Sequence, residues 1–417
     1  MTELTGYLRS DGRKGIRNRV AVAYLVECAH HVAREIAWPN RRDAHVIGFP
    51  GCFPNAYAQG MMERLCTHPN VGAVLLVSLG CESFNRFQLE SVIRESGRPV
   101  ETLVIQRSGG TAATIAKGQA WIEATLADLA RQERVPMDVS ELVVGTVCGG
   151  SDGTSGISGN PAAGRAFDRL VEAGAACIFE ETGELIGCEE IMADRAVTPE
   201  LADILRASVA KAARYYATLG FGSFAAGNAD GGLTTIEEKS LGAYAKSGQS
   251  RISGLIKPGD IPPKGGLYLM DVVPDGEVRF GFPNISDNAE IVEMMASGAH
   301  MTLFVTGRGS VVGSALAPVI KIAANPEMYL RLSADMDVNA GRIIEGTASV
   351  DEIGQEIYDL VLDAAAGRQT CSEAMGHAEF ILTYKSFEPI GPGCLLACPG
   401  IAQREKTWDV CKESAVS

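Results

Sequence analysis

Four cysteines stand in short turns directly after segments with the pattern of buried strands. The cysteines and the segments they follow are Cys28 after 19–27, Cys52 after 44–49, Cys81 after 71–78 and Cys148 after 141–147. The carboxyl ends of parallel strands share one edge of a sheet, so these thiols can converge there. A group of thiolates is typical of a metal or iron–sulfur site, and the alternative is that each cysteine is a small residue packing its own turn. We expect Cys52, Cys81 and Cys148 to form the site, with Cys28 as a possible fourth member.

A run rich in Gly and Ser, residues 151–160, opens a helix that we expect at 161–173. Its backbone N–H groups and hydroxyls can hold an anion at the amino end of that helix. Asn160 and Pro161 alone are also explained as an N-cap and a first helical residue. The side chains that we expect to contact a substrate in this run are Ser151, Asp152, Thr154 and Asn160.

Charged residues with small or apolar neighbours are further candidates for substrate binding and catalysis. Arg308 lies between two glycines after another predicted strand, where its guanidinium can fork onto a carboxylate or pair with an acidic neighbour. Glu181 belongs to a group of glutamates with two interpretations. They can face a catalytic site, or they can form the solvated first turn of a helix, where acidic residues are favoured. Lys239 and Lys321 stand among apolar or small residues, where a lysine can act as a base, although surface lysines also occur in such surroundings.

Strand and helix patterns alternate along the chain and position these residues. In the first third, predicted strands at 19–27, 44–49, 71–78 and 101–106 alternate with helices at 29–38, 56–66, 84–95 and 111–131. After a polar linker at 131–138 the alternation resumes, with strands at 141–147, 176–179, 266–272 and 301–306. This pattern predicts an α/β fold with two doubly wound parallel-sheet (Rossmann-like) domains. We place these domains at 1–135 and 136–390, followed by a peripheral tail at 391–417.

The composition narrows the class of protein. The 417 residues are 46% hydrophobic and carry a formal net charge of −14, which excludes a disordered chain and argues against nucleic acid or an anionic membrane as partner. No apolar run is long enough to cross a bilayer, and the first residues lack the pattern of a signal peptide. We therefore expect a cytoplasmic protein. The 11 scattered cysteines are then reduced, as core residues or ligands.

Collinear motifs resemble those of one family, the altronate and galactarate dehydratases, which includes the large subunit of sulfolactate sulfo-lyase. The motifs are GYLRSDGRKGIRN at 6–18, LGCE at 79–82, GGT at 109–111, CGGSDG at 148–153, GGLTTIEEKSLG at 231–242, TGRGS at 306–310 and GTA at 346–348. The resemblance covers the large catalytic part of those enzymes, from about residue 6 to 387. It departs from them at Gly48, which stands where the sugar-acid enzymes carry a histidine.

The resemblance implies a metal-dependent lyase. The expected reaction is elimination of water from a 2,3-dihydroxy sugar acid to give a 2-oxo acid; the alternatives are carbon–sulfur cleavage of sulfolactate and an inactive sugar-acid-binding relative. The implied cofactor is Fe²⁺, with an iron–sulfur cluster or another divalent ion such as Mn²⁺ as alternatives. For this chemistry we assign metal binding to Cys52, Cys81 and Cys148, and proton transfer to Glu181 or Lys321. Arg308 is assigned a catalytic role in holding the substrate carboxylate, and we expect substrate binding by Ser151, Asp152, Thr154, Asn160, Lys239 and Arg308.

The resemblance also implies partners. Family members carry a small β-rich domain before the opening Gly-Tyr segment or use it as a separate subunit. Only five residues precede Gly6 here. We therefore expect a separate small β-rich subunit, or an enzyme that has dispensed with it, in addition to a small hydroxy-acid substrate and assembly as a homo-oligomer.

Overall fold

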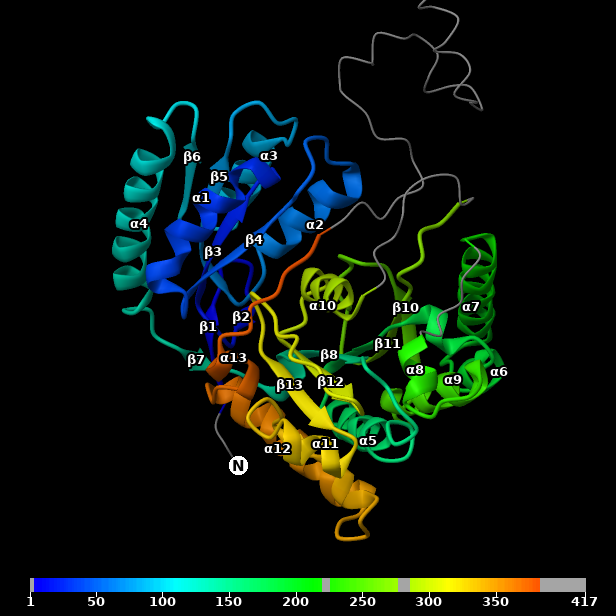
Figure 1. Ribbon diagram of the computed structural model, residues 1–417. Helices are drawn as coiled ribbons and strands as arrows, with labels where there is room; N and C mark the ends of the chain where they lie inside the picture. The colour runs from blue at the N-terminus through cyan, green and yellow to red at the C-terminus, as the bar shows by residue number, and fades with distance from the viewer. Residues whose placement is uncertain (1–3, 220–225, 277–285, 383–417) are drawn as a thin grey trace, which may run out of the picture.

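Two parallel sheets form the framework of the chain, as the alternating pattern predicted (Figure 1). The structure is a computed structural model, and it describes residues 4–219, 226–276 and 286–382. The predicted tail at 391–417 lies outside the described residues. The α/β fold with Rossmann-like parallel sheets flanked by helices is confirmed.

The N-terminal lobe is built on a four-stranded parallel sheet in the order β4-β3-β5-β6. Its strands are β3 (Arg19–Tyr24), β4 (Ala44–Gly48), β5 (Val71–Ser78) and β6 (Val100–Val104), and its helices are α1 (Glu27–Ala37), α2 (Ala56–Cys66), α3 (Arg86–Glu95) and α4 (Gly110–Leu129). Every residue of β5 is buried, because helices cover both faces of the sheet. The apolar run at 71–78 is therefore a central strand.

A small antiparallel sheet joins the two lobes. It has the order β2-β1-β7 and contains β1 (Thr5–Leu8), β2 (Lys14–Gly15) and β7 (Val135–Pro136). β7 lies within the polar segment that we predicted as a linker. The segment is thus fixed by pairing with β1, which brings the start of the chain against the beginning of the second lobe.

The C-terminal lobe contains a seven-stranded parallel sheet in the order β10-β11-β9-β8-β12-β13-β14. Its strands are β8 (Val143–Cys148), β9 (Ala176–Phe179), β10 (Ile252–Ile256), β11 (Gly266–Met270), β12 (Met301–Thr306), β13 (Val319–Ala323) and β14 (Val338–Asn339). Its helices are α5 (Gly159–Glu172), α6 (Glu189–Ala193), α7 (Pro199–Leu219), α8 (Ala226–Asp230), α9 (Ile236–Tyr244), α10 (Asp287–Ala296), α11 (Pro326–Arg331), α12 (Val350–Ala366) and α13 (Cys371–Met375). From β8 the chain moves to β9 on one side and later to β12 on the other, so the strand order reverses beside β8.

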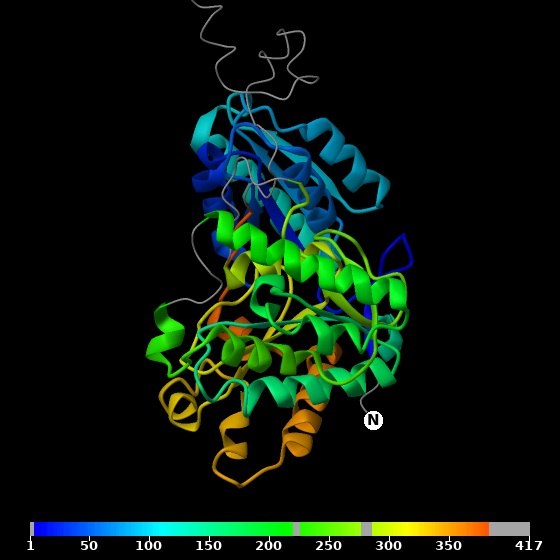
Figure 2. The ribbon, with the colours of Figure 1, turned by 90° about the vertical axis from the view of Figure 1, so that its right-hand side faces the viewer.

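The two parallel sheets meet at their amino ends. The Asn70 amide, just before β5, donates to the carbonyl of His300, just before β12, over 3.0 Å. In Figure 1, α4 runs from the far end of the N-terminal lobe down to β7, and the β13 arrow points away from that lobe. The carboxyl ends of the two sheets therefore lie at opposite ends of the molecule. The lobes stack one above the other in the second view (Figure 2).

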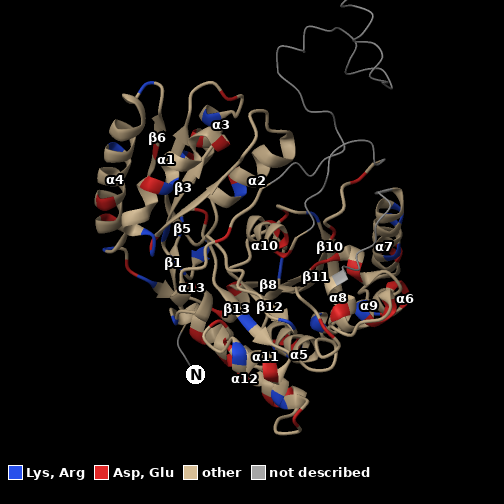
Figure 3. Cartoon of the chain, viewed as in Figure 1, with Lys and Arg blue, Asp and Glu red and all other residues tan. Residues whose placement is uncertain are grey.

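Charged residues of both signs are interspersed over both lobes (Figure 3). Within the part of the chain that the structure describes, no helix is long and apolar enough to cross a membrane.

Candidate active site

A cavity of about 240 Å³ opens at the carboxyl ends of β8, β9 and β12, beside the reversal in strand order. Cys148 is the last residue of β8, and Glu181 follows the neighbouring strand β9 after one residue. The two strands are parallel partners, so these side chains reach the same rim. This is the place where open parallel sheets bind their ligands.

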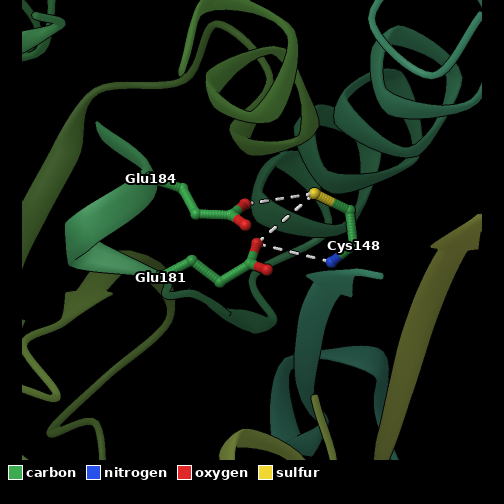
Figure 4. A group of neighbouring side chains, drawn as sticks. All are labelled: Cys148, Glu181 and Glu184. Atoms are coloured by element: carbon green, nitrogen blue, oxygen red, sulfur yellow. Dashed lines mark hydrogen bonds between the residues drawn. The ribbon is translucent and has the colours of Figure 1, made fainter. Parts of the chain in front are cut away.

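The Cys148 thiol lies between two glutamates (Figure 4). Its Sγ atom is 3.4 Å from Oε2 of Glu181 and 3.6 Å from Oε2 of Glu184. The backbone N–H of Cys148 donates to the same Glu181 oxygen over 3.4 Å. Cys148 and Glu181 are buried, so this thiol and carboxylate face each other in a region of low dielectric.

Two buried lysines face the same group. Lys246 forms an ion pair with Glu181 and places Nζ 3.4 Å from Sγ of Cys148. Lys239 places Nζ 2.7 Å from Oε1 of Glu184 and donates to Oγ of Ser151 over 3.1 Å. Burial by itself lowers the pKa of Lys239, but Cys148 and Glu184 outweigh it and hold that pKa above its ordinary value. Lys239 is therefore a cation rather than a base at neutral pH.

Carboxyl groups outnumber these lysines. Five line the site or contact its lining, namely Glu180, Glu181, Glu184, Asp287 and Glu290, against the two buried ammonium groups of Lys239 and Lys246. Burial, followed by the charge of Glu184, raises the pKa of Asp287 to about 6. An excess of buried negative charge is costly unless a cation or protons compensate it.

The donor set fits a divalent cation. Among the described residues, two groups have ligand atoms that all lie within 4.8 Å of one another: Cys148 with Glu181 and Glu184, and Glu180 with Glu181 and Glu290. Carboxylate oxygens suit Mn²⁺ and Fe²⁺, and a thiolate adds a softer ligand. Glu181 belongs to both groups and is the residue that connects them.

Glu181 is also held in an uncommon backbone conformation. Its φ angle is 76°, and among the described residues it is the only non-glycine with a positive φ. Such a conformation costs of order 1–3 kcal/mol and is typically kept where function requires it. The turn after β9 thus supports the assignment of Glu181 to the site.

A second cavity, of about 450 Å³, lies on the other side of Lys239. Ser151, Asp152 and Asn160, which belong to the Gly- and Ser-rich run at 151–160, line it. Asn160 is 1% exposed and donates from Nδ2 to the carbonyl of Gly242 over 2.8 Å. Its Oδ1 atom is itself buried and has no hydrogen-bond partner among the described residues.

Asp152 and Thr154 of the same motif also support the loop. Oδ1 of Asp152 accepts from the backbone N–H groups of Thr154, over 2.9 Å, and Ser155, over 3.2 Å. Thr154 also donates its hydroxyl to this oxygen and does not line either cavity. Arg308 lies exposed in the lining of the smaller cavity, where it donates to the carbonyl of Gly227.

Comparison with known proteins identifies the family. Residues 6–130 match the second domain of D-galactarate dehydratase/altronate hydrolase, and residues 139–387 match the C-terminal domain of D-galactarate/altronate dehydratase. The second match alone covers more than half of the chain. The chain belongs to the galactarate/altronate dehydratase family.

Named members of this family are similar over most of the chain. The (2R)-sulfolactate sulfo-lyase subunit beta of Chromohalobacter salexigens is 34% identical over 91% of this chain and 96% of its own length. Galactarate dehydratase (L-threo-forming) of Escherichia coli is 31% identical over 89% of this chain and 74% of its own length. Altronate dehydratase of the same organism is 28% identical over 89% of this chain and 75% of its own length.

Two of the three predicted metal ligands of this family member lie outside the candidate active site. Cys52 and Cys81 are exposed at the carboxyl end of the N-terminal sheet, whereas Cys148 is buried at the carboxyl end of the other sheet. Because the sheets meet at their amino ends, the structure does not bring the three thiols together. The predicted shared thiolate site is corrected to Cys148 with carboxylates.

Lys321 is also placed away from the cavity. It lies within β13, and its Nζ is 3.1 Å from Nδ1 of His377. Burial lowers the pKa of Lys321 against the opposing charge of Asp335. Lys321 lines neither of the two cavities, so we remove it from the candidate site residues. Lys246 is the buried lysine that we add to them.

The sequence analysis of this dehydratase-family chain missed three residues of the site, Lys246, Asp287 and Glu290. Asp287 and Glu290 stand in the first turn of α10, where acidic residues are expected for helix stability alone. Lys246 follows α9 in a single 3-10 turn and carries no motif. Only the pairing of buried Lys and Glu in space identifies it.

Proposed function

We propose that this protein is a lyase that removes a β-leaving group from a 2-hydroxy acid and yields a 2-oxo acid. The observation that carries the proposal is the convergence of a buried thiol, five carboxyl groups and two buried lysines on the cavity at the carboxyl ends of β8 and β9. Relatives named as dehydratases and as a sulfo-lyase subunit support the same class of reaction.

The first step of such a reaction removes a proton next to a carboxylate, so negative charge develops on the substrate. Buried positive charges stabilise that charge most strongly where water is excluded. Lys239 and Lys246 supply two such charges beside the cavity. Arg308, in the lining of the cavity, is placed to bind the substrate carboxylate with its two-pronged guanidinium.

Proton transfer is assigned to Asp287. A pKa of about 6 lies close to neutral pH, where a carboxyl group can both accept and return a proton. Glu181, which the sequence suggested for this role, already pairs with Lys246 and belongs to both candidate cation sites. We therefore assign Glu181, with Cys148 and Glu184, to holding a divalent ion such as Fe²⁺ or Mn²⁺. When bound, that ion would act as a Lewis acid towards the oxygen atoms of the substrate.

The larger cavity favours a polyhydroxylated substrate. It adjoins the reaction cavity at Lys239, and its lining includes the polar residues Ser151, Ser155 and Asn160. Hydroxyl and amide groups of this kind can exchange hydrogen bonds with the hydroxyl groups of a substrate. We therefore favour elimination of water from a sugar acid whose remaining hydroxylated carbons occupy this cavity.

Sulfolactate is the second candidate substrate. The sulfolactate sulfo-lyase subunit shares 34% identity and is matched over 96% of its length, more than either dehydratase from E. coli. Sulfolactate has few hydroxyl groups to offer the larger cavity. The two candidates therefore differ in how much of the larger cavity the substrate occupies.

A substrate panel tests the proposal. Protein purified without oxygen and supplied with Fe²⁺ or Mn²⁺ is assayed with aldonates, aldarates and sulfolactate for 2-oxo acid and for sulfite. We expect the chain alone to form 2-oxo acid from a sugar acid without sulfite, at a rate below full turnover when no partner subunit is present. Sulfite release would favour the second candidate. Failure with every substrate, in a protein that also binds no stoichiometric metal, would indicate an inactive binding relative.

A partner subunit is proposed on the same grounds. The relative from C. salexigens is named as a beta subunit, and such a protein acts with another chain. We propose that a small subunit completes the site of this chain, which itself assembles as a homo-oligomer. Full turnover by the purified chain alone would contradict the first part, and a monomeric mass in solution would contradict the second.

A further inference from the structure

The exposed cysteines gather at one edge of the molecule. Of the eight cysteines that the structure describes, three are exposed: Cys28, Cys52 and Cys81. Cysteine is among the residue types most often buried, so exposed free thiols require an explanation. All three follow strands of the N-terminal sheet, and they lie at its carboxyl edge, away from the reaction cavity.

Hydrogen bonds between loops bring the three cysteines near one another. β3 lies between β4 and β5, so the loops after these three strands are neighbours. The N–H of Glu27, beside Cys28, donates to the carbonyl of Pro50 over 3.2 Å. The N–H of Ser83 donates to the carbonyl of Cys52 over 2.9 Å, which places the loop of Cys81 against that of Cys52.

The loop that carries Cys81 is held in place from within. Oε2 of Glu82 accepts from the N–H of Gly80 over 2.8 Å, and Oε1 of the same residue accepts from the hydroxyl of Ser78. Gly80 has a φ of +124°, which a residue with a side chain rarely adopts. The backbone before Cys81 is thus fixed so that the thiol faces outward instead of packing into the core.

The three thiols do not form a close ligand group of the kind that holds a single ion. The ligands of one ion lie close together, and within the described residues such close groups are formed by Cys148 and carboxylates, not by these three thiols. In an iron–sulfur cluster each thiolate binds a different iron, so the sulfur atoms of the cysteines lie further apart. Thiolates are also the ligands that such clusters select.

We propose that Cys28, Cys52 and Cys81 hold an iron–sulfur cluster at the carboxyl edge of the N-terminal sheet. Three cysteine ligands leave one iron for a ligand that is not a cysteine, and the exposure of all three thiols opens that iron to solvent. The site is separate from the cation site of Cys148, Glu181 and Glu184. It is therefore independent of the proposed function and can be tested without an assay of activity.

Spectroscopy and analysis of bound iron and acid-labile sulfide test the proposal. The full chain is purified without oxygen and reconstituted with Fe²⁺ and sulfide, and Cys28→Ser, Cys52→Ser and Cys81→Ser are compared with the wild type. Each substitution should abolish bound sulfide, the charge-transfer absorption and the electron paramagnetic resonance signal of the reduced protein. Cys148→Ser and Cys371→Ser are the matched controls and should retain all three signals.

Chemical footprinting keeps the test independent of variant folding. In the wild-type protein, the reconstituted cluster should protect Cys28, Cys52 and Cys81 from alkylation, and removal of iron should restore their reactivity. Iron bound at these residues without sulfide would overturn the proposal, as would a cluster that is lost only in Cys148→Ser. Unchanged alkylation of the three thiols after reconstitution would overturn it as well.

Discussion

Cys148, Glu181 and Lys246 show how local charge is balanced in the site. Lys246 is fully buried, and its ammonium group pairs with a carboxylate that is also a ligand in both candidate cation sites. Burying either charged group alone would cost free energy. As a pair they hold the end of β8, the turn after β9 and the turn after α9 close together. The same pairing explains why neither sequence pattern nor propensity could identify Lys246.

Replacing Lys246 by methionine should therefore be strongly destabilising. The change keeps the length of the side chain but leaves Glu181 buried without its partner, at a cost of about 3–5 kcal/mol in the free energy of unfolding. Denaturant unfolding measures it, with Lys264→Met as the control because Lys264 is exposed. Equal unfolding free energies in the two variants would show that the ion pair contributes nothing.

Arg308 offers a test at the cavity lining that leaves the core intact. Arg308→Lys keeps the charge but loses the planar fork that can hold a carboxylate through two hydrogen bonds. We expect a loss of about 2 kcal/mol in transition-state binding, or roughly 30-fold in kcat/KM, once the substrate is known. Steady-state kinetics measures it. A kcat/KM equal to that of the wild type would remove Arg308 from substrate binding.

At the scale of elements, the strongest sequence signals gave accurate boundaries. The expected strands at 71–78, 176–179 and 301–306 and the helix at 56–66 match β5, β9, β12 and α2 residue for residue. Short continuous apolar runs between polar or glycine-containing turns indicate buried strands once their length is taken into account. The run at 151–160 lies at the carboxyl edge of the sheet, because a loop after a parallel strand must reach that edge; its role as a ligand site stays a prediction.

Two failures have clear physical causes. β13 was missed because Lys321 interrupts its apolar pattern, and the burial of that lysine depends on the distant His377. The expected union of Cys52, Cys81 and Cys148 failed because local patterns place each thiol at the edge of its own sheet. They do not encode that two sheets meet at their amino ends.

Gly149 shows how closely the first loop of the site approaches α10. A Cβ atom at this position would lie 1.9 Å from Oδ2 of Asp287, so Gly149→Ala must displace a carboxyl group that we assign to proton transfer. We expect a loss of activity well over tenfold, because small misplacements of reacting groups cost about 100-fold.

Gly60→Ala is the matched control for this substitution. Gly60 lies in α2, lines neither cavity, and has no atom within 4 Å of an added Cβ. The two variants are compared in kcat and in thermal unfolding. Similar activities in both would show that the position of Asp287 does not limit the reaction.

At the scale of the whole molecule, polar contacts fix the junction of the two lobes. Arg17, before β3, pairs with Glu373 of α13 over 2.7 Å, and both side chains are about nine-tenths buried. One apolar cluster is also shared, since it contains residues of α2 and of α10. The reaction cavity and the cysteine edge are thus held at opposite ends of one framework.

His300 makes this junction sensitive to pH. The N–H of Val143 donates to Nδ1 over 3.0 Å, and Nε2 faces the carbonyl of Lys14 at 2.9 Å, so the ring is neutral and carries its proton on Nε2. Burial lowers the pKa of His300 to about 4, against the opposing effect of the Lys14 carbonyl. Protonation would add a hydrogen to Nδ1, where it would face the N–H of Val143. It would also give a positive charge to a ring that has no access to water.

The free energy of unfolding should therefore fall as the pH falls. The unfolded histidine binds a proton near pH 6.5 and the folded one only near pH 4, so the loss begins at about pH 6.5 and is complete near pH 4. This difference corresponds to about 3 kcal/mol.

The variant His300→Gln tests this prediction. The glutamine amide can make both hydrogen bonds without titrating, so the free energy of unfolding of this variant should fall by about 3 kcal/mol less across this pH window. His31→Gln, at an exposed position, should follow the wild type. Denaturant unfolding between pH 4 and 7 measures all three proteins, and parallel curves for His300→Gln and the wild type would contradict the prediction.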